Sequence, residues 1–342
     1  MDTAILIIYT GGTIGMKQDP ETGALVPFNF EQIKDEVPEL KKFKFRIDTI
    51  SFNPLVDSSD IQPDFWVRLV QLIKENYNSY NGFVILHGTD TMSYTASALS
   101  FMLQNLSKPV ILTGSQLPIG MLRTDGKENL ISAIEIAAAT KNDTPVVQEV
   151  CVFFQNLLFR GNRTIKYNAE NFNAFRSENF PPLAEAGITI RYNFTELSKH
   201  YSSDKLKVYT ELDTNVVTLR LFPGIQPQIL DGIFAIKGLK AVVLETFGAG
   251  NASTGEWFTS RIKGAVEKGI LVLNVTQCPA GRVEMDLYDT GVQLKKAGVC
   301  SGYDLTVEAA LTKLMYLLGR YDDIDEVKNM LDKPVSGEFS LE

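Results

Sequence analysis

The chain has 342 residues and an ordinary globular composition, with 44% hydrophobic and 22% charged residues. At about 150 residues per domain, this length favours two domains. The net charge of −8 and the isoelectric point near 5.1 argue against nucleic acid or an anionic membrane surface as a partner, because both require clustered positive charge.

No segment indicates export or membrane insertion. Met1 and Asp2 lead directly into an apolar strand without a cationic leader or a small-residue cleavage site, and no apolar run reaches the ~20 residues of a membrane span. The three cysteines, Cys151, Cys278 and Cys300, form no C-x-x-C pair, which is typical of a reduced compartment. We therefore expect a cytoplasmic protein.

Several enzyme classes lack their signatures. His87 and His200 are the only histidines, so a histidine-rich metal site cannot be built, and neither lies near a G-x-S-x-G elbow. No G-x-G-x-x-G follows the first strand, and no G-x-x-x-x-G-K-[ST] occurs. A serine hydrolase with a histidine triad and a Rossmann dehydrogenase are therefore poor explanations of this chain.

The first organised stretch is Ile5 to Met16 (ILIIYTGGTIGM). Its apolar, β-branched start predicts a buried parallel strand, which runs into a glycine turn. Ligands bind at the carboxyl ends of such strands, where glycines let main-chain N–H groups approach a substrate oxygen. Thr13 is therefore a candidate nucleophile, although a turn threonine that caps the next segment is the more common explanation of this pattern alone.

Loops and a second strand follow. The polar segment 17–27 predicts either a mobile lid over the strand end or a plain surface hairpin. We expect a short helix over 30–37 and a strand over 46–52. Asp57-Ser58-Ser59 then precedes a helix that begins near Pro63 with an apolar stripe. Such a run also suits ordinary N-cap chemistry.

A second strand end presents a hydroxyl, now beside a carboxylate. The strand Gly82 to Leu86 leads into His87-Gly88-Thr89-Asp90-Thr91-Met92. Asp90 or Thr91 can cap the helix that is expected to run through Leu103. This turn is the second candidate for a substrate-binding strand end.

The same alternation of strand, turn and helix recurs along the chain, at 109–112, 129–139 and 149–154, and then at 216–222, 241–246, 257–268, 270–275 and 305–318. It predicts an α/β fold with a mostly parallel sheet covered by helices on both faces. The polar segment 193–215 is the predicted linker. It divides an N-terminal domain, 1–192, from a C-terminal domain, 216–342.

Three motifs together resemble the bacterial-type L-asparaginases, and most closely the cytoplasmic type I branch. They are Thr10 to Gly15 (TGGTIG), His87 to Met92 (HGTDTM) and Arg160 to Lys166 (RGNRTIK). Asp57-Ser58-Ser59 and the Thr276-Gln277-Cys278 turn also fit. The resemblance therefore spans nearly the whole chain.

The resemblance implies an amidohydrolase of asparagine catabolism that converts L-asparagine to L-aspartate and ammonia without a metal or cofactor. Its fold has a larger N-terminal α/β domain and a smaller C-terminal α/β domain, and it assembles as a homodimer or a dimer of dimers. The implied catalytic residues are Thr13 as nucleophile, Thr89 as second threonine, Asp90 as acid and Lys166 as lysine. The implied substrate-binding residues are Asp57, Ser58, Ser59 and Gly88.

The chemistry of Lys166 leaves two possibilities open. An unperturbed lysine has a pKa of about 10.4 and is protonated at neutral pH, so a lysine base must be buried or hydrogen-bonded. Asp90 can position this lysine, but a carboxylate also favours its charged form. Without the resemblance, an exposed lysine or a structural ion pair would explain Lys166 better.

The sequence departs from the family pattern at three positions. Leu25 stands where the family commonly has a lid tyrosine, for which Tyr9 or another tyrosine is a candidate substitute. Some type I enzymes bind asparagine at an allosteric site, but here Glu245 replaces the expected arginine and Ile165 replaces a threonine. A reversed charge would repel the effector's carboxylate, so we expect no allosteric control.

Two alternative functions remain. One is a related amidohydrolase that prefers glutamine or supplies ammonia, as does a subunit of an archaeal tRNA amidotransferase; that subunit has an extra N-terminal domain, whereas the first motif here begins almost at residue 1. The other is an amino-acid sensor, which would lack the nucleophile or the lysine. Asparagine and glutamine differ by one methylene, worth about 1–3 kcal/mol, so the sequence allows some glutaminase activity.

Overall fold

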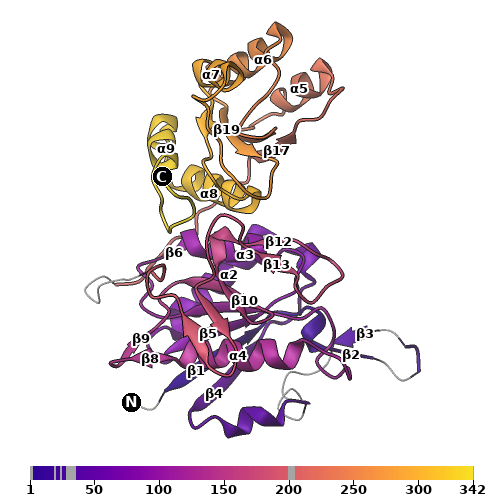
Figure 1. Ribbon diagram of the computed structural model, residues 1–342, viewed down its shortest axis with the longest axis vertical. Helices are drawn as coiled ribbons and strands as arrows, with labels where there is room; N and C mark the ends of the chain where they lie inside the picture. The colour runs from indigo at the N-terminus through magenta and orange to yellow at the C-terminus, as the bar shows by residue number, and fades with distance from the viewer. Residues whose placement is uncertain (1–2, 19–20, 24, 28–35, 199–204, 342) are drawn as a thin grey trace. The chain divides into compact units, whose positions relative to one another are not determined.

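The structure is a computed structural model that describes residues 3–18, 21–23, 25–27, 36–198 and 205–341. The chain divides into two compact units, Met1–Tyr209 and Thr210–Glu342. Each unit has its own sheet with helices packed against it (Figure 1). The predicted two-domain α/β fold class is confirmed.

The N-terminal unit is built on an eight-stranded sheet with the order β15-β14-β11-β10-β7-β5-β1-β4. Its strands are β1 (Ala4–Tyr9), β4 (Arg46–Ser51), β5 (Gly82–Leu86), β7 (Val110–Thr113), β10 (Val150–Phe154), β11 (Leu157–Arg160), β14 (Ala184–Ala186) and β15 (Ile190–Tyr192). The strands from β4 to β10 run parallel. The last three are antiparallel, so the sheet is mixed, and this antiparallel edge was not predicted.

The register of the parallel strands determines where the site lies. All residues of β1 and β5 are buried, as expected for strands covered on both faces. Tyr9 pairs with Ser51 and Leu86, and Leu86 pairs with Thr113. The turns after β1, β4, β5 and β7 therefore leave the sheet at the same edge.

Helices cover both faces of this sheet. One face carries α2 (Pro63–Asn76) and α3 (Met92–Met102), and the other carries α4 (Gly126–Ala138) (Figure 1). The predicted apolar stripe of α2 is confirmed by five buried residues: Phe65, Trp66, Leu69, Val70 and Ile73. On the opposite face, α4 packs Leu130, Ala133 and Ile134 into the same cluster as Ile5 and Ile7.

Several local details differ from the expectations. Thr91 occupies the N-cap of α3 as predicted, but its hydroxyl donates to the Ser58 carbonyl and makes no cap bond. Leu103 begins β6 (Leu103–Gln104) instead of continuing α3, and α4 begins at Gly126, earlier than predicted. Of the helix expected over 30–37, residues 30–35 lie outside the described residues.

Two ambiguous segments take defined backbone structure. The segment after the first turn forms a hairpin, in which β2 (Met16–Gln18) pairs antiparallel with β3 (Leu25–Pro27). Within the range expected as a linker, β16 (Lys207–Val208) pairs with β6. The remaining short elements of this unit are η1 (Thr13–Gly15), η3 (Pro38–Lys42), η4 (Ser58–Asp60), η5 (Gly161–Arg163), β8 (Thr140–Lys141), β9 (Thr144–Pro145), β12 (Ile165–Lys166) and β13 (Phe175–Arg176).

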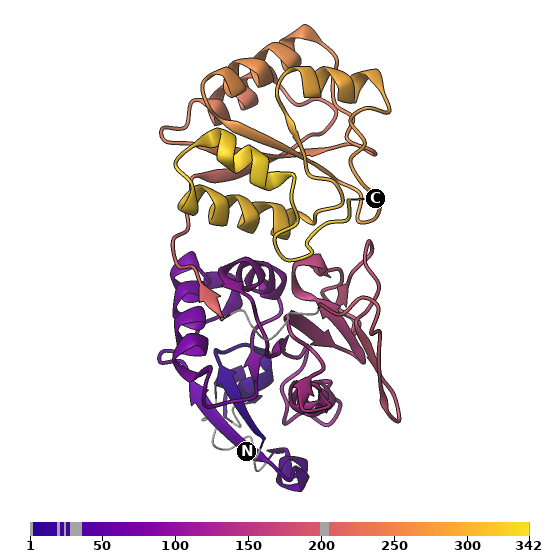
Figure 2. The same ribbon diagram turned by 90° about the vertical axis from the view of Figure 1, so that its left-hand side faces the viewer.

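The C-terminal unit has a parallel sheet with the order β17-β18-β19-β20. Its elements are β17 (Val216–Arg220), α5 (Pro227–Phe234), β18 (Ala241–Thr246), α6 (Glu256–Glu267), β19 (Leu271–Thr276), α7 (Asp289–Lys296), β20 (Cys300–Ser301), α8 (Val307–Arg320) and α9 (Ile324–Leu331). The yellow C-terminal helices and the orange helices cover different faces of this sheet (Figure 2). The strands and helices predicted between 216 and 318 are present, whereas α5, α7 and β20 were not predicted.

No helix within the described ranges combines the length and apolar character that a membrane span requires.

Candidate active site

Three turns at the common sheet edge meet backbone to backbone. A methyl group added to Gly12 would lie 2.6 Å from the Gly88 Cα, and one added to Gly11 would lie 2.3 Å from the Val56 carbonyl oxygen. At Gly88 an added methyl group would lie 2.5 Å from the Ser58 Oγ. Only glycine allows this approach. The turns after β1, β4 and β5 thus form one interlocked floor.

Thr13 begins the 3₁₀ turn η1 on this floor and is half-buried. The turn is anchored from both sides, because the Tyr9 hydroxyl donates to the Gly15 carbonyl at 3.0 Å and the Ile119 N–H donates to the Ile14 carbonyl at 3.3 Å. Burial raises the pKa of Tyr9 to about 12. This inward bond contradicts the suggestion that Tyr9 substitutes for a lid tyrosine.

Thr89, Asp90 and Lys166 meet although the lysine is more than seventy residues away in the chain. The Lys166 Nζ donates to the Thr89 Oγ1 at 2.8 Å and to the Asp90 Oδ1 at 2.6 Å. The Lys166 side chain is 18% exposed, whereas the Asp90 side chain is 62% exposed. Lys166 is therefore partly shielded from water, and its pair with Asp90 opens to solvent.

The protons in this cluster have defined directions. The Thr89 oxygen accepts from Lys166, and its own hydroxyl donates to the Gln116 Oε1 at 3.3 Å. An amine that donates to a carboxylate and a hydroxyl together is best satisfied as an ammonium. In this arrangement Lys166 must lose a proton before it can accept one.

Gln116 is a site residue that the sequence reasoning did not single out. Its Nε2 donates to the Asn171 carbonyl at 3.1 Å, and its main-chain N–H donates to the Asp125 carboxylate. Burial raises the pKa of Asp125, while the N–H groups of Gln116 and Leu117 oppose that rise. The sequence did contain a signal for Gln116. It follows β7, the neighbour of β5, and parallel strands end at the same edge of a sheet.

A buried ion pair supports the strand that precedes the lysine motif. The Arg160 Nε lies 2.7 Å from the Glu149 Oε2, and both side chains are 9% exposed. The Ser198 N–H donates to the Glu149 Oε1, and the Thr164 hydroxyl donates to the Arg160 carbonyl. Lys166 then lies in β12, paired with Phe175. These contacts hold the lysine segment against the sheet.

Asp57, Ser58 and Ser59 lie in the turn after β4. Asp57 caps η4, where its carboxylate accepts from the Ser59 N–H at 2.9 Å and from the Ser59 hydroxyl at 2.8 Å. These two bonds lower the pKa of Asp57. The N-cap explanation is therefore correct for Asp57, which nonetheless stays exposed and charged. Ser58 is buried beside Gly88.

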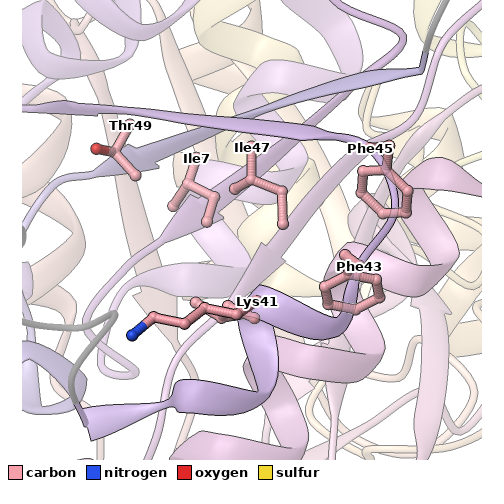
Figure 3. A pocket seen from close by; sticks show the side chains of 7 residues that line it. Ile7, Lys41, Phe43, Phe45, Ile47 and Thr49 are labelled. Carbon is pink, nitrogen blue, oxygen red and sulfur yellow. The ribbon is translucent and has the colours of Figure 1, made fainter.

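An apolar hollow of about 230 Å³ lies elsewhere in this unit, between η3 and the β1–β4 face (Figure 3). Its lining is formed by Ile7, Leu40, Lys41, Phe43, Phe45, Ile47 and Thr49. The lining includes none of the predicted site residues. Across the part of the chain that the structure describes, no group of three or more His, Cys, Asp or Glu is arranged to hold a metal ion.

Comparisons with known proteins agree along the whole chain. The family model described as "Asparaginase, N-terminal" matches residues 4–197, and that described as "Glutaminase/Asparaginase C-terminal domain" matches residues 215–331. The chain is 43% identical to "L-asparaginase 1" of Escherichia coli K12, over 98% of both chains. It is 42% identical to the "60 kDa lysophospholipase" of Mus musculus, over 98% of this chain and 62% of that protein.

A solved structure gives the same result. The crystal structure of L-asparaginase I from Vibrio cholerae matches this structure with a TM-score of 0.90 and 42% identity, and the match covers 100% of both chains.

Proposed function

The chain belongs to the asparaginase family, and from this premise we propose that it is an L-asparaginase that hydrolyses the side-chain amide of L-asparagine to L-aspartate and ammonia. The observation that best supports this function is the contact of Lys166 with both Thr89 and Asp90, on a floor shared with the turn of Thr13. An amide hydrolase needs a hydroxyl, a proton acceptor and main-chain donors in one place.

In the proposed reaction, the Thr13 hydroxyl attacks the amide carbon of asparagine. Its proton passes through Thr89 to a base. We assign the role of this base to the neutral form of Lys166. Main-chain N–H groups of the two glycine turns stabilise the oxyanion, and such a donor is worth roughly 3–4 kcal/mol in other enzymes. The C–N bond then breaks, the leaving nitrogen takes up a proton, and ammonia departs.

The resulting aspartyl ester on Thr13 is hydrolysed in the second half of the reaction. Water attacks the ester carbon and gives its proton to the Thr89–Lys166 pair. The bond to the Thr13 oxygen then breaks, the pair returns this proton to that oxygen, and aspartate is released. The close approach of Lys166 to Thr89, at 2.8 Å, supports a shared path for both proton transfers.

The substrate's charged groups require opposite partners. We assign its ammonium to the carboxylates of Asp57 and Asp90, both exposed at the site. Ser58, Ser59 and the main chain at Gly88 would bind its α-carboxylate. The bonds from Ser59 that keep Asp57 ionised support its assignment as an ammonium ligand.

We further propose that the enzyme acts in the cytoplasm as a homodimer or a dimer of dimers, with residues 193–215 as the interdomain linker. These assignments follow from the family relationship and from the composition of the chain. No cofactor takes part in the proposed reaction.

The test is ammonia release from L-asparagine and from L-glutamine by purified protein. We expect hyperbolic turnover of asparagine, with a fall in kcat of about 10³-fold or more for Thr13→Val and for Thr89→Val. Thr144→Val makes the same change on an exposed hairpin, so it should leave kcat unchanged.

Three other outcomes would each replace the proposal. Binding of asparagine by folded protein without turnover of either amide would indicate an amino-acid sensor. A preference for glutamine would indicate a related amidohydrolase. Release of fatty acid from a lysophospholipid, with no turnover of asparagine, would point to the activity named for the mouse relative.

A further inference from the structure

A buried chain of hydrogen bonds ends at the floor of the site and plays no part in the proposed reaction steps. The Trp66 Nε1 lies 3.0 Å from the Thr95 Oγ1, which lies 2.9 Å from the His87 Nε2. The His87 Nδ1 lies 2.6 Å from the carbonyl oxygen of Gly88. His87 is 0% exposed and follows β5 directly. The chain thus runs from α2 through α3 to the turn that carries Thr89.

The chemistry of the partners fixes the direction of every bond. The Trp66 indole can only donate, so the Thr95 oxygen accepts from it. The Gly88 carbonyl can only accept, so the His87 Nδ1 must carry the proton. In the neutral imidazole the Nε2 is then an acceptor, so the Thr95 hydroxyl directs its proton to it.

The surroundings of His87 favour its neutral form. The ring lies nearly perpendicular to that of Phe65, with 5.7 Å between the ring centroids. Burial lowers the pKa of His87 to about 4, despite its bond to Gly88. The imidazole therefore stays uncharged near neutral pH, and its Nε2 remains an acceptor for the Thr95 hydroxyl.

Holding the Gly88 carbonyl also fixes the next N–H group. The Gly88 C=O and the Thr89 N–H belong to one planar trans peptide and point in opposite directions. Glycine adds no side chain that would restrict this peptide. With its carbonyl held by His87, the peptide keeps the Thr89 N–H directed away from the buried ring, and the Thr89 hydroxyl follows from the same backbone.

We infer that His87 is a positioning residue of the site: its Nδ1–H holds the Gly88 carbonyl and so orients Thr89 toward Lys166 and the substrate. The inference deepens the proposed amide hydrolysis and rests on it for its kinetic consequence. Its structural part, the tautomer and the bond to Gly88, can be tested without any activity.

The first experiment is NMR of protein labelled with ¹⁵N-histidine, over pH 5 to 8. The chain has two histidines, so His200→Gln assigns both signals. We expect His87 to be neutral, protonated on Nδ1 and unchanged across this range. A proton on Nε2, or a titration near pH 6.5, would overturn the inference even if the enzyme hydrolyses asparagine.

The second experiment compares two amide replacements of the ring. In His87→Asn the side-chain amide can place an N–H near the position of Nδ1 and keep the bond to Gly88. In His87→Gln the longer side chain places its amide near Nε2 and reaches Thr95 instead. We expect kcat to fall about 100-fold for His87→Gln and less than about 10-fold for His87→Asn, with KM changed by less than about threefold in both.

A purely structural role predicts a different pattern. The activity of the two variants would then follow their thermal stability, and His87→Asn, which leaves the larger cavity, would be the poorer enzyme. Equal kcat values for the two variants, or that reversed order, would refute the positioning role. Rates must be normalised to folded protein.

Thr95→Val keeps the test decisive if the His87 variants fail to fold. It removes the donor to the His87 Nε2, together with the acceptor of the Trp66 indole, without changing the shape of the side chain. Thr113→Val is the matched control, because the Thr113 hydroxyl is also buried and donates to the Phe153 carbonyl at 2.8 Å. We expect a fall in kcat of about tenfold for Thr95→Val and none for Thr113→Val. Equal effects of the two substitutions would contradict the inference.

Discussion

At Gly12 the addition of a single methyl group would disrupt the interlocked floor of the site. Its φ of 87° lies in the left-handed region, which costs other residues about 1–2 kcal/mol, and the new carbon would lie 2.6 Å from Gly88. We expect Gly12→Ala to lower kcat at least about tenfold, because the turns of Gly12 and Gly88, which carry the proposed Thr13 and Thr89, must move apart. Steady-state rates of ammonia release measure this.

Gly232→Ala is the control for that substitution. Gly232 lies in α5, and a methyl group there would meet nothing within 4 Å. Alanine is the better helix former by about 1 kcal/mol, so this variant should be as stable as the parent protein or more so, with unchanged kcat. Normal activity in Gly12→Ala would show that the turns do not need their close approach.

The pKa of His87 makes a prediction about stability. A histidine with a pKa of about 4 in the folded state and about 6.5 when unfolded stabilises the fold above pH 6.5, and this contribution is lost as the pH falls toward 4. The full difference amounts to about 3 kcal/mol. The free energy of unfolding of the N-terminal unit, measured with urea, should therefore decrease as the pH falls from 6.5 to 4.5.

The control for this pH dependence is His87→Asn, which cannot titrate. We expect the difference in unfolding free energy between the parent protein and this variant to shrink as the pH falls through the same range. A constant difference would mean that His87 takes up its proton equally in both states.

At this scale the sequence predicts the residues of each motif but not how their side chains meet. Thr13, Thr89, Asp90 and Lys166 are visible in the three motifs. Gln116 lies outside these motifs, and His87 lies within one of them without any signal of its contacts, because the direction of a side chain across neighbouring loops leaves no periodic pattern. The bond from the Thr91 hydroxyl to the Ser58 carbonyl was missed for the same reason, because the sequence predicted only a helix cap at Thr91.

Among the elements, the β10–β11 hairpin supports the lysine segment through its buried ion pair. Glu149→Gln would leave the Arg160 guanidinium buried beside a neutral group, and breaking a buried pair typically costs about 3–5 kcal/mol. We expect a lower melting temperature together with a lower kcat, because Lys166 follows this hairpin. Glu267→Gln removes an exposed pair with Lys263 and should cost less than about 1 kcal/mol.

The long elements were predictable because their buried residues recur at a regular spacing or form continuous apolar runs. The stripe of α2 repeats at helical spacing, and β5 is a continuous apolar run. The two-residue strands β12 and β13 and the three-residue strand β14 leave no such pattern. Their pairing depends on partners that are distant in the sequence, so tertiary contacts decide it.

The whole molecule is expected to respond to asparagine without cooperativity. Glu245 is buried at β18, and its carboxylate pairs with the Arg220 guanidinium at 3.2 Å. Glu308 is close enough for Glu245 to raise its pKa further, although burial is the main cause of that rise. The Arg220 guanidinium pairs with Glu245, whose carboxylate lies near that of Glu308. An effector's carboxylate would therefore be repelled here.

Initial rates over a hundredfold range of asparagine concentration should therefore follow a hyperbola. Arg220→Ala should leave the shape of the curve unchanged. A sigmoidal curve that becomes hyperbolic in Arg220→Ala would show instead that this arginine binds an effector.

The two-unit architecture was predictable from length and from the repeated alternation of strand and helix. The order of the strands was not, because β1 lies between β4 and β5 while β5 lies beside β7, and no local pattern states which strands pair. The antiparallel edge of β11, β14 and β15 follows from hairpin connections that the apolar pattern did not reveal.

The interlocked floor also has a consequence during synthesis on the ribosome. Its turns come from the starts of three separate crossovers, and the lysine arrives only with β12, which pairs with β13 at Phe175–Arg176. Contacts this distant in sequence form slowly. A nascent chain shorter than about 175 residues cannot present the assembled site, so it should not bind substrate, and ligand cannot guide the earliest folding of its own binding site.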